Sequence, residues 1–398
     1  MNNNDIFNAI TGWSSEFVAI RRDIHRYPEL GFEEHRTSTL VANRLSAWGY
    51  SVERGLGGTG VVGQLKRGQR QRRLGSRADM DALPITEAND FDHVSHHAGV
   101  MHACGHDGHT AMLLAAARYL AEEGKFDGTL NLIFQPAEEG LGGAKRMMED
   151  GLFNKYPCDA IFAMHNMPGV TQGHLLLRDG PAMASSDRVI VVIKGIGGHA
   201  AMPHHASDPV VAAASIVMAL QTVVSRNVDP QQTAVITVGA LNAGDADNVI
   251  PQTATLKLSV RALDPNVRNL LEERIKALVH EQAKSFGVDA IVDYKRVNPV
   301  LVNTVTETEF ARGVALDLVG ADRVNLQCRA QTGSEDFAFM LEQLPGSYIL
   351  IGNGEGDSAG ACMLHDPNYE FNDDNLSIGA TYWVRLAERY LHNDPQNI

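Results

Sequence analysis

The chain has 398 residues, of which 44% are hydrophobic and 21% charged, and its formal net charge is −14. This length exceeds the roughly 250–300 residues at which one hydrophobic core stops growing, so we expect two domains. The acidic balance argues against nucleic-acid binding, which uses clustered Lys and Arg to neutralise phosphates. We find no apolar run of about 18 residues and no secretory signal at the start, and therefore expect no membrane partner and a cytoplasmic location.

Amphipathic helices are predicted first, over residues 6–26, where Pro28 follows, and over 37–48, where Gly49 closes the helix. From Val61 onward, β-branched apolar runs alternate with helical stretches. This alternation predicts an α/β fold with a mostly parallel central sheet. The expected strands are 60–66, 73–78, 129–134 and 160–164, with a helix over 109–123. Such sheets bind ligands beyond the carboxyl ends of their strands.

A different order begins near residue 187. Strands are predicted over 189–194, 234–238 and 254–260, and helices over 209–224 and 265–286. The β-α-β-β-α-β order is typical of a small ferredoxin-like sandwich. We therefore predict an inserted α+β domain over residues 186–297. It divides a discontinuous α/β domain made of residues 1–185 and 298–398, which ends in a helix over 376–391.

Two adjacent carboxylates, Glu138 and Glu139, follow the expected strand 129–134. Neighbouring residues in an irregular turn can point in different directions, so one carboxylate could hold a metal while the other moves a proton. Glu-Glu pairs are also common on solvated surfaces. Support for a site must therefore come from elsewhere in the chain.

That support comes from Cys104 and His106, which are separated by one glycine and directly precede an alanine-rich helix. A thiolate and an imidazole at this spacing can reach a common site, and both are good ligands for zinc-like metals. The flanking glycines indicate a tight, backbone-crowded loop. A plain helix N-terminus with a buried cysteine and surface histidines is the open alternative. The chain has only four cysteines, too scattered for a disulfide framework.

Two further histidines stand at comparable places. His165 follows the expected strand 160–164, and His365 follows the glycine-rich loop after 348–351. A lone histidine is more often structural or exposed. Their shared position beyond strand ends favours membership of one site.

Seven short motifs, spread over nearly the whole chain, occur in the order in which one known family has them. They are residues 26–30, 77–84, 104–110, 135–139, 197–203, 248–251 and 333–337. By these motifs the chain resembles the M20 metallopeptidase clan, in its branch of hippurate hydrolases and N-acyl-L-amino acid amidohydrolases. The resemblance implies a metal-binding catalytic α/β domain and an inserted lid and dimerisation domain.

The resemblance also implies a two-ion site, with Cys104 as the bridge and Glu138 as the general base. Mixed thiolate, imidazole and carboxylate ligands accept Mn, Zn, Co or Ni, so the identity of the metal stays open. The implied metal ligands are Cys104, His106, Glu139, His165 and His365. Broader members of the clan have His-X-Asp where this chain has Arg77-Ala78-Asp79, so Arg77 is not a ligand here. Asp79 is then expected to orient a ligand from behind.

For the substrate, the resemblance implicates His199 as the donor to the developing oxyanion, and Asn248 and Arg261 in gripping the substrate. The fork of Arg261 suits the free α-carboxylate of an amino acid. The clan also suggests a homodimer, or a homotetramer. Whether His199 would act in its own subunit or in trans is left open.

The expected reaction is metal-dependent hydrolysis of N-acyl-L-amino acids, hippurate-like or N-acetylated, which releases a carboxylic acid and an amino acid. Which acyl group is preferred depends on pocket shape and is not set by the sequence. Three alternatives stay open. They are a dipeptidase or carboxypeptidase of the same clan, an amidase with Cys104 as nucleophile and His106 or His109 as base, and a metal-storing or ligand-binding module without turnover.

Overall fold

The computed structural model describes residues 3–392. The chain divides into two compact units. The first unit comprises Met1–Gly180, Val302–Arg329 and Asp336–Ile398, and the second comprises Pro181–Leu301 and Ala330–Glu335. The inserted domain expected over 186–297 lies inside the second unit, which extends a few residues further on both sides and includes a second short segment.

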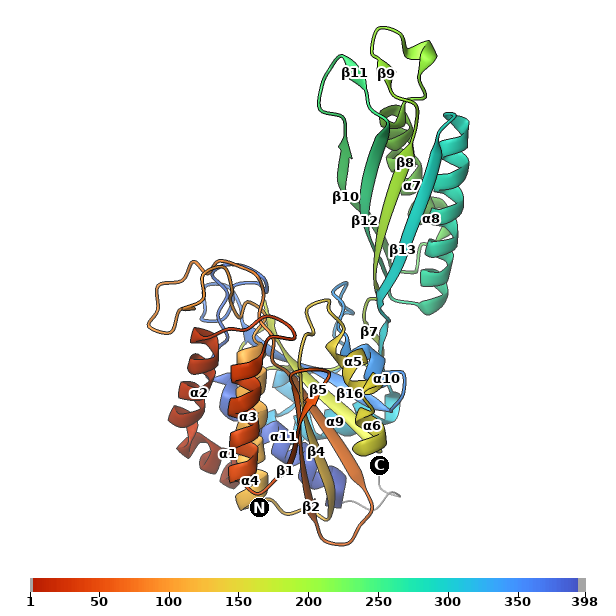
Figure 1. Ribbon diagram of the computed structural model, residues 1–398. Helices are drawn as coiled ribbons and strands as arrows, with labels where there is room; N and C mark the ends of the chain where they lie inside the picture. The colour runs from red at the N-terminus through yellow and green to blue at the C-terminus, as the bar shows by residue number, and fades with distance from the viewer. Residues whose placement is uncertain (1–2, 393–398) are drawn as a thin grey trace. The chain divides into compact units, whose positions relative to one another are not determined.

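The first unit is built on an eight-stranded sheet of order β1-β2-β4-β3-β5-β16-β6-β15 (Figure 1). Its strands are β1 (Ser51–Leu56), β2 (Gly60–Arg67), β3 (Arg73–Asp79), β4 (Gly128–Gln135), β5 (Ala160–Pro168), β6 (Leu175–Leu176), β15 (Val324–Asn325) and β16 (Gly346–Gly354). The central strands β4, β3, β5 and β16 run parallel, whereas β2 pairs antiparallel with β1 and β4. The fold class is confirmed as α/β, with a mixed sheet whose centre is parallel.

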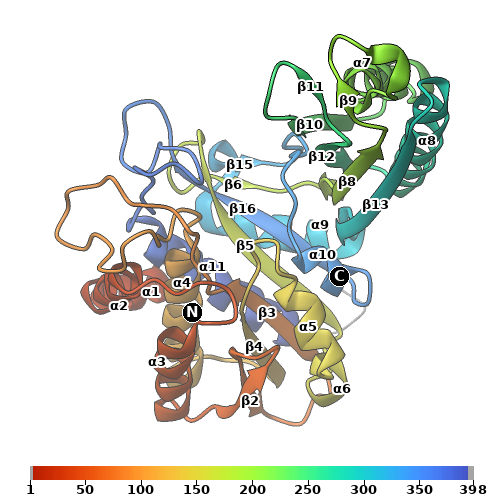
Figure 2. The ribbon, with the colours of Figure 1, turned by 45° about the horizontal axis from the view of Figure 1, so that its top comes forward.

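Helices cover both faces of this sheet (Figure 2). The helices are α1 (Asn3–Gly12), α2 (Ser14–Arg26), α3 (His35–Ala47), α4 (His106–Glu122), α5 (Gly143–Glu149), α6 (Leu152–Lys155), α9 (Val305–Val319), α10 (Phe337–Leu341) and α11 (Asn375–His392). Helices α4 and α11 pack together against β3, and α5 and α10 pack on each other against β4 and β5. Cover on both faces explains why the parallel strands read as continuous apolar runs.

The N-terminal helix predicted over 6–26 is wrong in one respect, because the structure has two helices that meet at Trp13. Gly12 is a poor helix former, and Trp13 leaves helical geometry at φ −104° and ψ 4°. The indole instead packs on α4, with the Arg118 guanidinium 4.1 Å from its ring centre. The helix predicted to end before Gly49 is confirmed, and Gly49 has a φ of 86°.

The second unit has a four-stranded antiparallel sheet of order β10-β12-β8-β13. Its main elements are β8 (Ser186–Lys194), α7 (Pro209–Asn227), β10 (Ala234–Ala243), β12 (Thr253–Ala262), α8 (Pro265–Ser285) and β13 (Asp289–Asn298). This is the predicted ferredoxin-like order. Asp208 and Asp264 cap α7 and α8, each followed by proline at the first helical position.

Shorter elements complete the chain. They are β7 (Gly180–Met183), β9 (Gly198–His199), the 3₁₀ turns Pro203–His205 and Ala321–Arg323, β11 (Val249–Ile250) and β14 (Leu301–Asn303). Strands β9 and β11 pair antiparallel with each other, beyond the ends of β8 and β12.

Helix α7 corrects the expectation that no segment could span a membrane, because its length and composition alone would allow it. The core helix of a soluble protein passes the same test, and one face of α7 packs in the core of the second unit through residues such as Ile216 and Leu220. Its other face carries Val211 and Met218, which are 51% and 71% exposed.

Candidate metal centre

The carboxyl ends of the parallel strands lie along one edge of the first unit's sheet. Asp79 is the last residue of β3 and pairs in register with Gln135, the last residue of β4. Gln135 leads directly into Glu138 and Glu139. The sequence predicted that His165 follows the end of its strand, but His165 lies inside β5, where it pairs with Leu350 of β16. The prediction placed the end of the strand where the apolar run stops, whereas the strand continues through polar residues.

The Cys104 loop is as crowded as its glycines predict. Gly105 has a φ of +91°, which side chains rarely adopt, and precedes the first residue of α4, His106. A Cβ at Gly105 would lie 2.3 Å from Asn166 Oδ1 and 2.4 Å from the Tyr369 hydroxyl. Glycine is therefore required here by conformation and by space. The loop holds Cys104 in a buried position.

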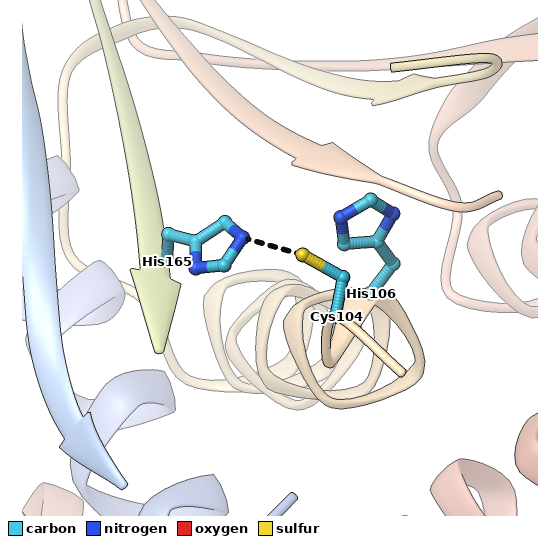
Figure 3. Close-up of side chains that lie close together, drawn as sticks. All are labelled: Cys104, His106 and His165. Atoms are coloured by element: carbon cyan, nitrogen blue, oxygen red, sulfur yellow. Dashed lines mark hydrogen bonds between the residues drawn. The ribbon is translucent and has the colours of Figure 1, made fainter. Parts of the chain in front are cut away.

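The structure brings all five predicted ligands together around Cys104. Figure 3 shows three of them, Cys104, His106 and His165. Cys104 Sγ lies 3.4 Å from His165 Nε2. Three overlapping groups have ligand atoms within 4.8 Å of one another: Cys104 with His106 and His165, Cys104 with Glu139 and His365, and His106 with Glu138 and Glu139. Cys104 shares a group with each of the other four predicted ligands, which is the position expected of a bridging ligand.

Two rings are oriented by the backbone. The Nδ1 atoms of His106 and His165 donate to the carbonyls of Asp81 and Asn166, at 2.8 and 2.7 Å. In the neutral rings, each Nε2 then carries a lone pair that faces the cluster. His106 Nε2 and Glu139 Oε1 are buried and have no hydrogen-bond partner in the described part of the chain. Orphaned buried groups of this kind are costly, and a bound cation would satisfy both.

Burial and neighbouring charges shift several pKa values in the cluster. Burial, with Glu139 nearby, raises the pKa of the Cys104 thiol well above its usual range. Burial alone would also raise the pKa of Asp79, but the charges of His106 and Arg77 outweigh it and hold that pKa well below the ordinary value. The carboxylate of Glu139, whose Oε1 lies 3.4 Å from His365 Nε2, raises the pKa of His365. A thiol in such a place becomes a thiolate when a metal binds it.

The loop that carries Glu138 and Glu139 is fixed from several sides. Ala137 has a φ of 54°, uncommon for a residue with a side chain, and its N–H donates to Glu34 Oε1 at 2.8 Å. The backbone N–H of Glu139 donates to Asp81 Oδ2 at 3.0 Å. The buried carboxylate of Glu138 accepts from the Asp336 backbone N–H at 3.3 Å. The two adjacent carboxylates thus have separate supports, as the turn predicted.

Some supporting residues were missed or given another role. His109, considered only as a base for Cys104, donates from Nδ1 to Asp79 Oδ1 at 2.6 Å and contacts Asn166 through Nε2 at 2.7 Å. Its place three residues after His106 on one helix face could have revealed this. Asp81 and Asp336 were inside quoted motifs, but neither has a sequence neighbour that discloses its partner.

In the second unit, His199 and Asn248 come together. His199 lies in β9 and pairs with Val249 of β11, and the Asn248 carbonyl accepts from the Ala200 N–H at 3.1 Å. Both side chains are exposed, and His199 Nδ1 accepts from the Ala201 N–H at 3.1 Å. The glycine pair before His199 allows this close pairing of two short strands.

Arg261 is not brought to His199 within the second unit. It sits near the end of β12 opposite Val235, half-buried, and burial together with Arg188 lowers the pKa of its guanidinium. The other end of β12, Thr253, pairs with Lys194, on the side where β9 follows. Thr253 and Arg261 are eight residues apart on the strand. At about 3.3 Å per residue, this places Arg261 roughly 26 Å from the end that leads to His199.

Comparison with known proteins agrees with these features. Residues 75–389 match the model of peptidase family M20/M25/M40. A hippurate hydrolase of Campylobacter jejuni is 47% identical, over 94% of this chain and 97% of that protein. An IAA-amino acid hydrolase of Arabidopsis thaliana is 40% identical, over 94% and 86%. The crystal structure of a dinuclear metal-binding M20 peptidase of Bacillus subtilis aligns with a TM-score of 0.82 and 30% identity, over 96% of this chain and 99% of that one.

The cluster of thiol, imidazole and carboxylate groups and the matches to amide hydrolases together define a metal-binding hydrolase that acts on amide bonds. The chain belongs to peptidase family M20/M25/M40, since the family model matches residues 75–389 and a relative at 47% identity covers 94% of the chain.

Proposed function

We propose that this enzyme hydrolyses the amide bond of N-acyl-L-amino acids with two divalent ions per subunit, releasing a carboxylic acid and a free amino acid. The observation that carries the proposal is the placement of buried Glu138 beside a five-ligand cluster that contains two orphaned buried atoms. Relatives named for hippurate and IAA-amino acid hydrolysis match nearly end to end. Hippurate-like and N-acetylated amino acids are the substrates to test first.

The residues that would hold the ions are the five predicted ligands, with Cys104 shared between them: Cys104, His106, Glu139, His165 and His365. Mixed thiolate, imidazole and carboxylate donors accept Mn, Zn, Co or Ni. When bound, the ions would supply Lewis-acid polarisation of the scissile carbonyl and a lowered pKa for the attacking water. Asp79 and His109 keep the ligand rings in place from behind.

Glu138 supplies the proton transfers. Its carboxylate takes a proton from the attacking water, and the same group returns that proton to the departing nitrogen, because an amide nitrogen leaves poorly unless it is protonated. The Asp336 N–H holds one carboxylate oxygen in place at 3.3 Å. The loop around Glu138 is fixed by its neighbours, so the carboxylate keeps its direction through both transfers.

The second unit would complete the site as a lid. Arg261 pairs its guanidinium fork with the substrate α-carboxylate, Asn248 holds the substrate, and His199 donates to the developing oxyanion. Closure of such a lid excludes water from the reacting groups.

His199 acts in trans, in a homodimer or in a homotetramer that contains such dimers. The support lies inside the second unit, where roughly 26 Å of strand separates Arg261 from the end that leads to His199. One small substrate does not span this distance, so the two residues that contact it come from different copies. The exposed apolar face of α7, with Val211 and Met218, is a surface that a second lid domain can cover.

The amidase alternative has less support. A nucleophilic cysteine needs a low pKa, whereas burial raises that of Cys104. A dipeptidase or carboxypeptidase of the same family would use the same cluster and differs only in substrate.

One assay tests the proposal. The chelated enzyme is reconstituted with Mn, Zn, Co or Ni and given benzoylglycine, N-acetyl amino acids, an indoleacetyl amino acid and dipeptides. We expect amide hydrolysis of the N-acyl amino acids only after metal is restored. Full activity after chelation, combined with loss to iodoacetamide, would support the cysteine amidase, and preference for free dipeptides would support the peptidase.

A further inference from the structure

A buried arginine stands directly behind the candidate metal centre. Arg77 lies in β3, with its side chain 1% exposed, and its guanidinium spreads over three partners. Nη1 donates to Asp79 Oδ2 at 2.7 Å, Nε donates to Gln135 Oε1 at 2.8 Å, and Nη2 donates to Asp336 Oδ1 at 3.2 Å. A buried cation is costly unless it is paired and hydrogen-bonded, so this fork is part of a fixed arrangement.

One end of the fork supports the metal ligands. Asp79 uses Oδ2 for Arg77 and Oδ1 for His109, and its Oδ2 lies 3.8 Å from His106 Nε2. Both carboxylate oxygens of Asp79 therefore accept hydrogen bonds from protein side chains. Asp79 orients the cluster from this position.

The other end supports the proton-transfer group. Asp336 Oδ1 accepts from Gln135 Nε2 at 2.7 Å, and Oδ2 accepts from the Ala144 N–H at 2.9 Å. The backbone N–H of the same residue donates to Glu138 Oε1 at 3.3 Å. Any shift of Asp336 would move this donor, and with it the carboxylate of Glu138.

We propose that Arg77 is a positioning residue that ties Asp79, behind the metal ligands, to Asp336, which holds Glu138, so that the metal centre and the proton-transfer carboxylate keep a fixed separation. The inference rests on the proposed function of Glu138. It explains why an arginine occupies the place where broader clan members have a ligand histidine. The planar fork presents donors in fixed directions to both carboxylates and to Gln135, whereas a lysine ammonium is a compact charge whose three donors leave from one nitrogen.

The test compares Arg77→Lys with Arg73→Lys as a matched control. Arg73 begins the same strand and forms an exposed pair with Asp159, so the control changes the same residue type outside the cluster. For Arg77→Lys we expect two ions per subunit with affinity, measured by chelator competition, reduced less than about tenfold. We expect kcat per metal-loaded site to fall by about 10–100-fold while KM changes little. Arg73→Lys should match the parent in each measurement.

A second variant keeps the test decisive if Arg77→Lys folds poorly. Asp336→Asn keeps Arg77 and its bond to Asp79, and it removes the negative charge that Arg77 meets on the Glu138 side. It should lower kcat to a similar degree with unchanged metal affinity. The double variant should lose no more than about the larger single loss, because both changes break one connection.

Three results would overturn the inference: unchanged kcat in both single variants, a loss carried entirely by KM, or losses that multiply in the double variant. Failure of the proposed function looks different. If Glu138→Gln keeps full kcat, the role of Glu138 is wrong, whatever Arg77 does.

Discussion

In the first unit, the candidate ligands come from strand ends and loops far apart in sequence, and buried partners hold nearly all of them in place. In the second unit, His199 and Asn248 are exposed at one end of a sheet, and Arg261 lies toward the other. We propose from this contrast that the metal chemistry is preorganised within one subunit, whereas substrate recognition is assembled when lid domains and copies come together. The predictions below test the two halves of this contrast, from the largest expected effect to the smallest.

The largest effect should come from Glu138→Gln. The amide keeps the size and the hydrogen bond from Asp336 but cannot accept a proton. We expect kcat to fall by at least about 10²–10⁴-fold, with both ions retained. Metal analysis beside kcat decides the matter, and loss of both ions or nearly full activity would show that the role is misassigned.

His199→Ala should lower kcat by about 10²–10³-fold without changing metal content, because the side chain serves only the developing oxyanion.

Arg261→Ala should instead raise KM, by about 10–100-fold, if the carboxylate contact is equally strong in the ground and transition states. Steady-state kinetics with one N-acyl amino acid separates the two. Loss of ions from the His199→Ala or the Arg261→Ala protein would contradict the proposal that the second unit contacts substrate and has no part in metal binding.

Cys104→Ser should weaken metal binding by at least about 10–100-fold, since a hydroxyl is a poorer and harder ligand than a thiolate. Activity should partly return at high metal concentration. Titration of activity against metal measures this directly. A stable acyl-cysteine trapped in the unchanged enzyme would instead establish covalent catalysis.

The smallest effect concerns Glu34, which supports the Glu138 loop through Ala137 and accepts from the Thr59 hydroxyl. Burial raises the pKa of Glu34 to about 7, so its protonated form is favoured in the folded state. The raised pKa makes the free energy of unfolding depend on pH. Protonated Glu34 stabilises the fold in full below about pH 4.5, and this stabilisation is lost as the pH rises through about 7. Glu34→Gln mimics the protonated acid.

We therefore expect Glu34→Gln to match the parent in stability near pH 4.5 and to exceed it at pH 8, by at most about 3 kcal/mol. Urea unfolding at the two pH values provides the measurement. A gain in unfolding free energy that is equal at both pH values, or larger at low pH, would show that titration of the Glu34 carboxyl does not cause the difference.

Much of the site could be predicted from the sequence, because its ligands stand in short motifs next to apolar strands. The expected strand ends indicated that Glu139, His165 and the Cys104 loop lie near one edge, and the resemblance to the clan assigned them as ligands. Other features depended on contacts that no local pattern reveals. Trp13 breaks its helix because it packs on α4, and Arg77 meets Asp336, 259 residues away.

The lid residues show a second limit of sequence reasoning. The β-α-β-β-α-β order was predictable from periodicity, but the separation of Arg261 from His199 follows from strand register. A motif gives a residue's neighbours along the chain and does not give its distance from another motif. This separation is what favours action in trans.

Subunit mixing tests the central claim most directly. Inactive His199→Ala and Glu138→Gln proteins are mixed under conditions where subunit exchange is verified, and activity is followed with time. If His199 serves the neighbouring subunit, each mixed dimer has one site with both defects and one with neither. Activity should then reappear, toward about half of the parent value per mixed dimer. No recovery despite verified exchange would place His199 in its own subunit's site and contradict the account.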